Sequence, residues 1–316
     1  MRGLIESHLT EGALDSLPAD VRHGLELPLK EIPPKYFYDA RGSELFEQIT
    51  SLPEYYPSRC ERALLNRHAP EIVQVTGAEE LVELGSGTAS KTRALLYAMA
   101  GRGRLRSYIP FDCSESVVRE CVELLEELFP GVWLHGVVGD FESHLEKIPP
   151  GNNRLIAFLG GTIGNLYPLE RSMFLERIGA SGDWLLLGTD LVKDARVIEA
   201  AYNDESGVTA QFNKNVLYAI NRELEADFDP EAFEHVAFFD RDNEWVEMRL
   251  RACSAQSVSI PGADIEVAIA AGEDIRTEIS AKFTPERIAA ELNAAGFDLK
   301  RFYTDGLFGL SLAQRL

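Results

Sequence analysis

Cysteine pairs, signal-peptide features and long apolar runs are all lacking in this chain. None of its cysteines forms a Cys-x-x-Cys pair or has a histidine at zinc spacing, so we expect reduced thiols and no metal site. These cysteines are Cys60, Cys113, Cys121 and Cys253. No window approaches the length of apolar residues that spans a membrane, and the first residues lack the apolar stretch of a signal peptide. We therefore expect a cytoplasmic protein with no membrane partner.

Positive charge is also in short supply. The 316 residues include 31 Lys and Arg against 51 Asp and Glu, which gives a net charge of −20. A protein that binds nucleic acid has to neutralise phosphates with clustered basic residues. The short basic piece at 102–106 is better interpreted as a solvated turn. The composition therefore favours a small-molecule substrate over nucleic acid, and the length allows one large domain or two ordinary ones.

A further absence concerns a glycine. Residues 82–88 read Val-Glu-Leu-Gly-Ser-Gly-Thr, an apolar strand end followed by a glycine turn. Counting from Gly85, the pattern runs Gly85-x-Gly87-x-x-Ser90, so the third glycine of the dinucleotide fingerprint is missing. An adenosyl cofactor without a pyrophosphate fits better, and S-adenosylmethionine is the obvious candidate. An ordinary strand-to-helix turn is the alternative.

Acidic residues follow the next two apolar strands. Asp112 ends the strand at 107–112, about 25 residues past Gly87, where a carboxylate meets the ribose hydroxyls of an adenosine. Asp140 and Phe141 follow the strand at 133–138 and could contact the amine and the face of adenine. Because ligands of open α/β sheets bind at the carboxyl ends of strands, the three strand ends together predict an adenosyl site. The alternative is that these acids only cap the helices that follow.

Strands and helices alternate from 80 to 190, which indicates a parallel sheet with helices on both faces. We predict strands at 80–84, 107–112, 133–138, 154–159, 184–189, 299–304 and 307–314. We predict one helix at 114–128 and another that begins at 285. The Asp305-Gly306 turn predicts an antiparallel hairpin at the end of the chain. The expected fold is therefore the α/β class I methyltransferase architecture, a Rossmann-like seven-stranded sheet with one reversed strand.

A break in the alternation predicts a second domain. Residues 193–280 mix a helical stretch at 208–224 with alternating strands such as 245–252. We predict an S-adenosylmethionine-binding methyltransferase domain at 61–192 and 281–316. Residues 1–60 and 193–280 are predicted to form a smaller α+β substrate-binding domain.

Several longer motifs identify a family. They are Pro34-Lys-Tyr-Phe-Tyr-Asp-Ala40, Leu52-Pro-Glu-Tyr-Tyr-Pro57, Val82-Glu-Leu-Gly-Ser-Gly-Thr88, Phe158-Leu-Gly-Gly-Thr-Ile-Gly-Asn165, Leu187-Gly-Thr-Asp-Leu-Val-Lys-Asp194 and Thr277-Glu-Ile-Ser280. Over nearly its whole length the chain resembles the S-adenosylmethionine-dependent L-histidine Nα-methyltransferases of ergothioneine biosynthesis. The resemblance implies that the protein methylates the α-amine of L-histidine three times to give hercynine. Tyr36 and Gly161 depart from residues that relatives often carry, tryptophan and serine, without removing a needed polar group.

The resemblance also implies site residues. The cofactor would be held by Gly85, Lys91, Asp112, Asp140 and Phe141. The histidine would be held by Tyr55, Asn165, Tyr202, Glu278 and Ser280. Asn165 and Tyr202 would meet the amino-acid head group, whereas Glu278 and Ser280 would meet the imidazole. Tyr55 and Tyr56 are adjacent, and the family motif selects Tyr55 as the one that faces the substrate.

The chemistry of these residues agrees with that assignment. Glu278 and Ser280 are two residues apart on a strand, so both side chains point to one side, where a carboxylate and a hydroxyl suit the two imidazole nitrogens. The alternative for Glu278 is a solvated surface charge. We predict Met248 as an apolar wall, with core packing equally plausible. Since no His/Asp base stands out, Tyr38 is interpreted as an orienter of the amine, with a packing role equally plausible.

Three rival functions remain at this point. A dehydrogenase would need the missing third glycine and hydride-transfer machinery. A non-catalytic adenosine-binding module would not need the polar set outside the nucleotide site. A methyltransferase of the same family could act on another amino acid such as tryptophan, but an indole has one donor and no acceptor, which fits Glu278 with Ser280 poorly. We expect a monomer whose partner is L-histidine.

Overall fold

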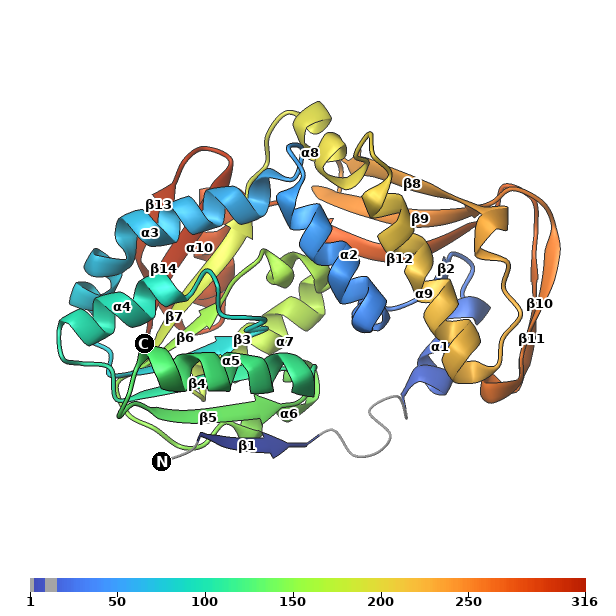
Figure 1. Cartoon of the computed structure of the whole chain (residues 1–316). Coiled ribbons are helices and arrows are strands. Elements are labelled where there is room, and N and C mark those ends of the chain that lie inside the picture. Colours follow the sequence, from blue (N-terminus) through green and yellow to red (C-terminus); the bar gives the residue numbers. More distant parts are fainter. Residues whose placement is uncertain (1–2, 9–15) are drawn as a thin grey trace. The chain divides into compact units, whose positions relative to one another are not determined.

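The computed structural model describes residues 3–8 and 16–316 (Figure 1). The chain divides into two compact units. Unit 1 comprises Met1–Glu11, Pro57–Leu191 and Phe283–Leu316, and unit 2 comprises Gly12–Tyr56 and Val192–Lys282. The chain thus leaves unit 1 after Leu191 and returns to it at Phe283, so the segment between them is an insertion.

Unit 1 is built on an eight-stranded sheet with the order β1-β5-β4-β3-β6-β7-β14-β13. Its strands are β1 Leu4–Ser7, β3 Glu80–Leu84, β4 Ser107–Asp112, β5 Trp133–Val138, β6 Arg154–Phe158, β7 Trp184–Asp190, β13 Phe297–Thr304 and β14 Phe308–Arg315. The strands from β5 to β7 run parallel, and β14 pairs antiparallel with both β7 and β13. The predicted class I methyltransferase sheet with one reversed strand is therefore confirmed.

One strand of this sheet differs from the sequence prediction. Leu4–Ser7 forms β1, which pairs parallel with β5 and extends the seven-stranded sheet at its edge. The prediction assigned residues 1–60 to the substrate-binding domain, partly outside the described residues. The pairing instead places this strand in unit 1, because a four-residue strand finds hydrogen-bond partners only at an existing sheet edge.

Helices cover the sheet of unit 1 (Figure 1). They are α3 Tyr56–Thr76, α4 Arg93–Gly101, α5 Glu115–Leu128, α6 Phe141–His144, α7 Pro168–Gly179 and α10 Pro285–Ala294, with the short 3₁₀ helices η2 Leu145–Lys147 and η3 Thr162–Asn165. Helix α5 shows how the sequence dictates the packing: Val118, Cys121 and Leu125 recur at helical spacing and all are buried. Helix α10 begins with Thr284, whose hydroxyl accepts a hydrogen bond from Arg287 N at 3.2 Å.

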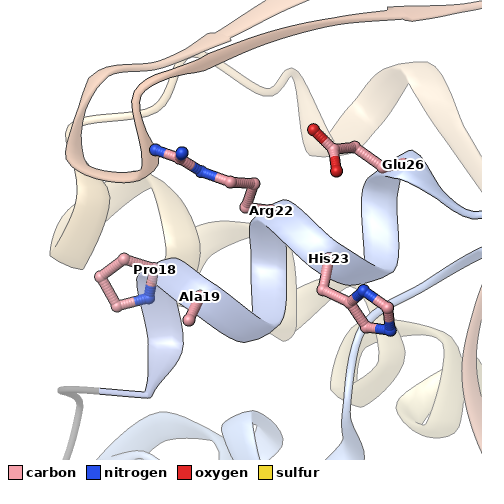
Figure 2. A pocket seen from close by; sticks show the side chains of 5 residues that line it. All are labelled: Pro18, Ala19, Arg22, His23 and Glu26. Atoms are coloured by element: carbon pink, nitrogen blue, oxygen red, sulfur yellow. The ribbon is translucent and has the colours of Figure 1, made fainter.

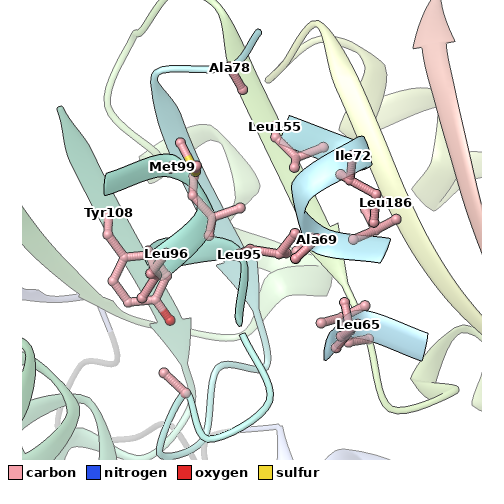
Figure 3. Packing of buried hydrophobic residues seen from close by; sticks show 14 of the residues in the cluster. Leu65, Ala69, Ile72, Ala78, Leu95, Leu96, Met99, Tyr108, Leu155 and Leu186 are labelled. Carbon is pink, nitrogen blue, oxygen red and sulfur yellow. The ribbon is translucent and has the colours of Figure 1, made fainter. Parts of the chain in front are cut away.

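The hydrophobic core of unit 1 lies between α3, α4 and the central strands (Figure 3). Leu65, Ile72, Leu95 and Leu96 of these helices are fully buried in one cluster with Leu155 of β6. Burying a leucine or isoleucine side chain contributes about 1.5–3 kcal/mol. This core fixes the carboxyl ends of β3, β4 and β6, from which the loops of the candidate site extend.

Unit 2 contains a four-stranded sheet, a two-stranded ribbon and several helices. The sheet has the order β2-β12-β9-β8, and β10 pairs with β11. Its elements are β2 Lys30–Glu31, β8 Phe233–Asp240, β9 Trp245–Ala252, β10 Gln256–Ile260, β11 Ile265–Ile269, β12 Asp274–Ala281, α1 Leu17–Glu26, α2 Ala40–Ser51, α8 Ala195–Tyr202, α9 Val208–Leu224, η1 Pro34–Phe37, η4 Pro230–Ala232 and η5 Pro261–Ala263. The predicted helix at 208–224 and strand at 245–252 are both present.

Among residues 3–8 and 16–316, no helix combines the length and the apolar character that crossing a bilayer requires.

A hollow lies along helix α1 of unit 2 (Figure 2). It is lined by Pro18, Ala19, Arg22, His23 and Glu26. Arg22 is already engaged, because its Nε donates to the carbonyl of Ala263 at 2.8 Å. None of the site residues predicted from the sequence lines this hollow, so the substrate is better sought elsewhere.

Candidate active site

The glycine turn after β3 has the backbone that the sequence predicts. Gly85 and Gly87 have φ values of 70° and 50°, the left-handed region that favours glycine. Gly85 N donates to the carbonyl of Phe111 at 2.8 Å, which ties the turn to the end of β4. A Cβ atom at either glycine would meet nothing within 4 Å. The glycines are therefore required by the turn, and the open space beside them leaves the backbone accessible to a ligand.

Asp112 braces this turn from the tip of β4. Its Oδ2 accepts a hydrogen bond from Gly87 N at 2.9 Å, and its Oδ1 accepts one from Ser114 N at 3.1 Å. Burial raises the pKa of the carboxyl, and these hydrogen bonds act against the rise. A carboxylate has about four lone-pair sites, so the two backbone bonds leave capacity for ribose hydroxyls. The bracing role is observed, and contact with the cofactor ribose remains a proposal.

Asp112→Ala is expected to weaken the binding of S-adenosylhomocysteine by about 1.5–3 kcal/mol, the range for hydrogen bonds to a charged group. The substitution removes an acceptor and leaves Gly87 N without its partner. Isothermal calorimetry measures the change, with Asp112→Asn as the matched control because the amide keeps one acceptor oxygen. Tight binding of NAD to the unmodified protein would contradict the cofactor assignment.

Asp140 and Phe141 follow β5 and start helix α6. Asp140 Oδ2 accepts a hydrogen bond from the Ser143 hydroxyl at 3.1 Å, which ties this acid to the first turn of the short helix. The Phe141 ring packs edge-on against Phe158, with 5.3 Å between ring centroids. The ring is partly exposed. These local contacts are observed, and contact with adenine remains a proposal for both residues.

Lys91 is held by a buried acid that the sequence analysis did not identify. Glu61 on α3 is fully buried, forms an ion pair with Lys91, and accepts a hydrogen bond from Gly160 N at 2.7 Å. Gly188 on β7 makes room for this carboxylate, since a Cβ at 188 would lie 2.2 Å from Glu61 Oε1. Glu61 thus joins α3, the glycine turn region and the loop after β6 within unit 1.

Asn165 ends the 3₁₀ helix η3 in the loop after β6. Gly160 and Gly161 precede that helix with φ values of 79° and 73°. A serine at position 161 would adopt this conformation with strain. Asn165 is partly exposed and lies in unit 1. The other predicted substrate residues all lie in unit 2.

Three polar side chains form a tight cluster in unit 2. The hydroxyls of Tyr202 and Ser280 lie 2.8 Å apart, and the ammonium of Lys282 donates to each of them at 2.9 Å. Lys282 has no exposed surface, and its Nζ lies 4.6 Å from the centroid of the Tyr202 ring. The structure therefore brings the two predicted residues together and adds a buried lysine that was not predicted.

Glu278 precedes this cluster on β12. Burial raises the pKa of its carboxyl to about 7, and the charge of Lys282 acts in the opposite direction. Part of the side chain is still reached by solvent. Met248 of β9 pairs with Glu278 across the sheet, so the two side chains share a face, and Met248 is only 2% exposed. The pairing is compatible with both predictions for Met248, a wall beside the carboxylate and core packing.

Aromatic rings connect the remaining predicted residues. Tyr55 lies edge-on to Tyr202, with 6.4 Å between centroids, whereas Tyr56 accepts a hydrogen bond from Lys193 Nζ at 2.7 Å. The adjacent tyrosines thus have different partners, although Tyr56 begins helix α3 and the two do not lie in an extended segment. Tyr38 is 37% exposed and packs edge-on against Phe46 at 5.6 Å. This contact supports the packing role of Tyr38, and its orienting role remains a proposal.

The features above define a class of enzyme. A parallel sheet with one reversed strand, a glycine turn after its central strand β3 and an acid at the tip of β4 are those of a class I S-adenosylmethionine-dependent methyltransferase. The model of the family described as histidine-specific, SAM-dependent methyltransferases matches residues 17–315. The chain belongs to this family.

Curated relatives agree with the family assignment. The chain is 52% identical to a histidine N-alpha-methyltransferase of Mycolicibacterium smegmatis, over 96% of this chain and 97% of the relative. It is 50% identical to a protein of the same name from Mycobacterium tuberculosis, over the full length of both. Ergothioneine biosynthesis protein 1 of Neurospora crassa is 29% identical, over 66% of this chain and 26% of that protein.

Proposed function

We propose that this protein transfers methyl groups from S-adenosylmethionine to the α-amine of L-histidine, giving Nα,Nα,Nα-trimethylhistidine (hercynine) in ergothioneine biosynthesis. The observation that carries the substrate assignment is the placement of Glu278 beside the Tyr202–Ser280–Lys282 cluster. A carboxylate acceptor next to hydroxyl donors matches an imidazole, which has one donor and one acceptor nitrogen. The family match and the full-length relatives support the same reaction.

The residues of unit 1 fit the adenosyl cofactor. The positive φ angles and the open space at Gly85 and Gly87 suit close approach of a ligand to the backbone, and Asp112 offers unused lone pairs. We propose that Gly85, Lys91, Asp112, Asp140 and Phe141 hold this cofactor. Bound S-adenosylmethionine would supply an electrophilic methyl group on its sulfonium sulfur.

The chain contributes mainly by positioning the substrate. Methyl transfer is an in-line displacement, so holding the amine at the correct distance and angle supplies most of the rate enhancement. We propose that Tyr55, Asn165, Tyr202, Met248, Glu278 and Ser280 bind the amino acid. The amine attacks through its lone pair and therefore has to be neutral, and we propose that the Tyr38 hydroxyl orients it.

The activity is tested by incubating the protein with S-adenosylmethionine and each of the twenty amino acids in turn. Mass spectrometry is expected to find successive methyl additions on L-histidine and a trimethylated product. Methylation of tryptophan in preference to histidine would replace the proposed substrate by the alternative. No methylated amino acid in any reaction would contradict the proposed function.

The pH profile tests the role of Glu278. Its pKa is raised to about 7, so the carboxylate that accepts the imidazole N–H is mostly protonated at pH 6 and mostly charged at pH 8. At subsaturating histidine, kcat/KM is therefore expected to rise through pH 7, and to keep rising as the substrate amine loses its proton. The profile of Glu278→Gln is expected to lack the rise near pH 7 and to keep the rise at alkaline pH. An identical profile in the variant would show that Glu278 is not part of the substrate site.

The proposed reaction also bears on location and assembly. Free histidine and S-adenosylmethionine are both cytoplasmic metabolites, so we propose that the protein acts in the cytoplasm. We further propose that it works as a monomer, because each of the predicted site residues is supplied by a single chain.

A further inference from the structure

Lys282 is unusual because it is charged and has no exposed surface. It follows directly on β12, two residues after Ser280, which itself lies two residues after Glu278. Alternate residues of an extended chain point to the same side, so all three side chains belong to one face. Burying an ammonium is costly unless it is paired and hydrogen-bonded, so its placement calls for an explanation.

The hydrogen bonds of this lysine constrain the protons of its neighbours. An ammonium only donates, so the oxygens of Tyr202 and Ser280 must both accept from Nζ. The two hydroxyls carry two hydrogens, and one of these is used in the 2.8 Å bond between them. Whichever hydroxyl donates in that bond, the other has a hydrogen left to donate outward. The hydroxyl that keeps this hydrogen accepts from both Nζ and the other hydroxyl, so both of its lone pairs are filled and it can only donate.

Two neighbouring side chains hold the backbone of Tyr202 in place. His235 Nε2 lies 2.8 Å from the carbonyl oxygen of Tyr202, and Asn213 Nδ2 lies 2.8 Å from His235 Nδ1. Since the asparagine nitrogen can only donate, the imidazole of His235 accepts at Nδ1 and donates its Nε2–H to the carbonyl. Burial lowers the pKa of His235, which favours this neutral form. These hydrogen bonds fix the backbone from which the Tyr202 phenol extends.

We propose that Lys282 is a positioning residue that turns the Tyr202–Ser280 pair into a donor for the acceptor nitrogen of the substrate's imidazole. Because its hydroxyl bonds that of Ser280, Tyr202 then serves the imidazole rather than the head group that the resemblance implies. This inference rests on the proposed function. Glu278, when charged, is acceptor-only and takes the N–H of the same ring. Together they specify which imidazole nitrogen carries the hydrogen, so the site selects one tautomer. An aromatic ring with a donor and no acceptor leaves the outward hydroxyl hydrogen without a partner.

The experiment compares L-histidine with the two pyrrolylalanine isomers, whose ring has an N–H and no acceptor nitrogen. Unmodified protein is expected to prefer histidine over both isomers by about tenfold or more in kcat/KM, the factor for one well-placed hydrogen bond in a buried site. In Lys282→Met the hydroxyls are free to rotate and accept. The preference is then expected to fall to within about threefold, mainly through a higher KM for histidine.

The design separates positioning from general damage. Loss of packing at position 282 would lower turnover of all three substrates together and leave their ratio unchanged. If Lys282→Met does not fold, the substrate preference is measured on Lys282→Gln, which fills the same space with a neutral polar group. Lys214→Met is the matched control, because that lysine pairs with the exposed Glu231 elsewhere in unit 2.

Two outcomes overturn the proposal while leaving the proposed function intact. The first is equal turnover of histidine and a pyrrole analogue by the unmodified protein. The second is an unchanged preference in a folded Lys282 variant that still binds S-adenosylhomocysteine. If the unmodified protein methylates none of these substrates, the proposed function itself fails, which is a distinct result.

Discussion

Glu278→Ala is expected to lower kcat/KM for L-histidine. The loss of transition-state stabilisation is expected to be about 2–5 kcal/mol, the cost of truncating one partner of a buried hydrogen-bonded charge. Glu278 sits in a desolvated environment that raises its pKa to about 7, and it shares a strand face with Ser280. Removing the carboxylate leaves the imidazole N–H of the substrate without its acceptor. Steady-state kinetics at pH 8, where the carboxylate is charged, measures the loss.

The same substitution is expected to change substrate preference. A site with a buried carboxylate rejects ligands that cannot pair with it, so its removal favours larger or less polar side chains such as indole. Shortening Met248, which pairs with Glu278 across the sheet, enlarges the space further. Glu278→Gln is the matched control, since it keeps the shape and one acceptor oxygen. An unchanged histidine-to-tryptophan preference in Glu278→Ala would show that the carboxylate lies outside the site.

Glu61→Ala is expected to reduce the free energy of unfolding by about 3–5 kcal/mol, the range for breaking a buried ion pair at one partner. The substitution leaves the Lys91 ammonium without its anion and Gly160 N without its acceptor. It also opens a space in a region where the carboxylate is fully buried. Urea unfolding measures the effect, and calorimetry with S-adenosylhomocysteine is expected to show weaker binding because Lys91 is no longer held.

A second acid on the same helix provides the control. Glu71 is about half exposed and lies 3.4 Å from the exposed Arg301, so Glu71→Ala is expected to change stability by at most about 1 kcal/mol. A comparable loss in both variants would mean that helix α3 tolerates no substitution of this kind. A Glu61→Ala protein as stable as the original would refute the bracing role.

Much of unit 1 was predictable because its signals are local. Apolar runs of five to seven residues ending in glycine or acid marked the strands, and the observed bounds of β3, β4 and β5 agree with the predicted ones. Strand β1 was missed for a physical reason. A four-residue segment carries too little periodicity to be recognised, and its pairing with β5 depends on an edge formed more than 120 residues later in the chain.

The candidate site was predictable where a motif or a spacing marked it. Glu278 and Ser280 were implied by the Thr277-Glu-Ile-Ser280 motif of the resemblance, and their two-residue spacing on a strand agreed with it. The same spacing continued one step further reaches Lys282. That lysine was overlooked because lysine at a strand end is ordinarily solvated. Glu61 carried no signal at all, since it stands among polar residues of a long helix and its burial depends on Gly160 and Gly188, about 100 residues or more away.

The close approach of Gly188 to Glu61 has a consequence for the order in which these positions can change. Any side chain at 188 would occupy the place of the carboxylate, since its first carbon would lie 2.2 Å from Glu61 Oε1. A substitution at 188 therefore displaces the Glu61 carboxylate from Lys91 and Gly160 unless Glu61 has already been replaced by a smaller residue. The effects of the two substitutions are coupled, because the first to occur breaks the ion pair and the second then costs less. Directed evolution of this scaffold would have to pass through that destabilised intermediate or change both positions together.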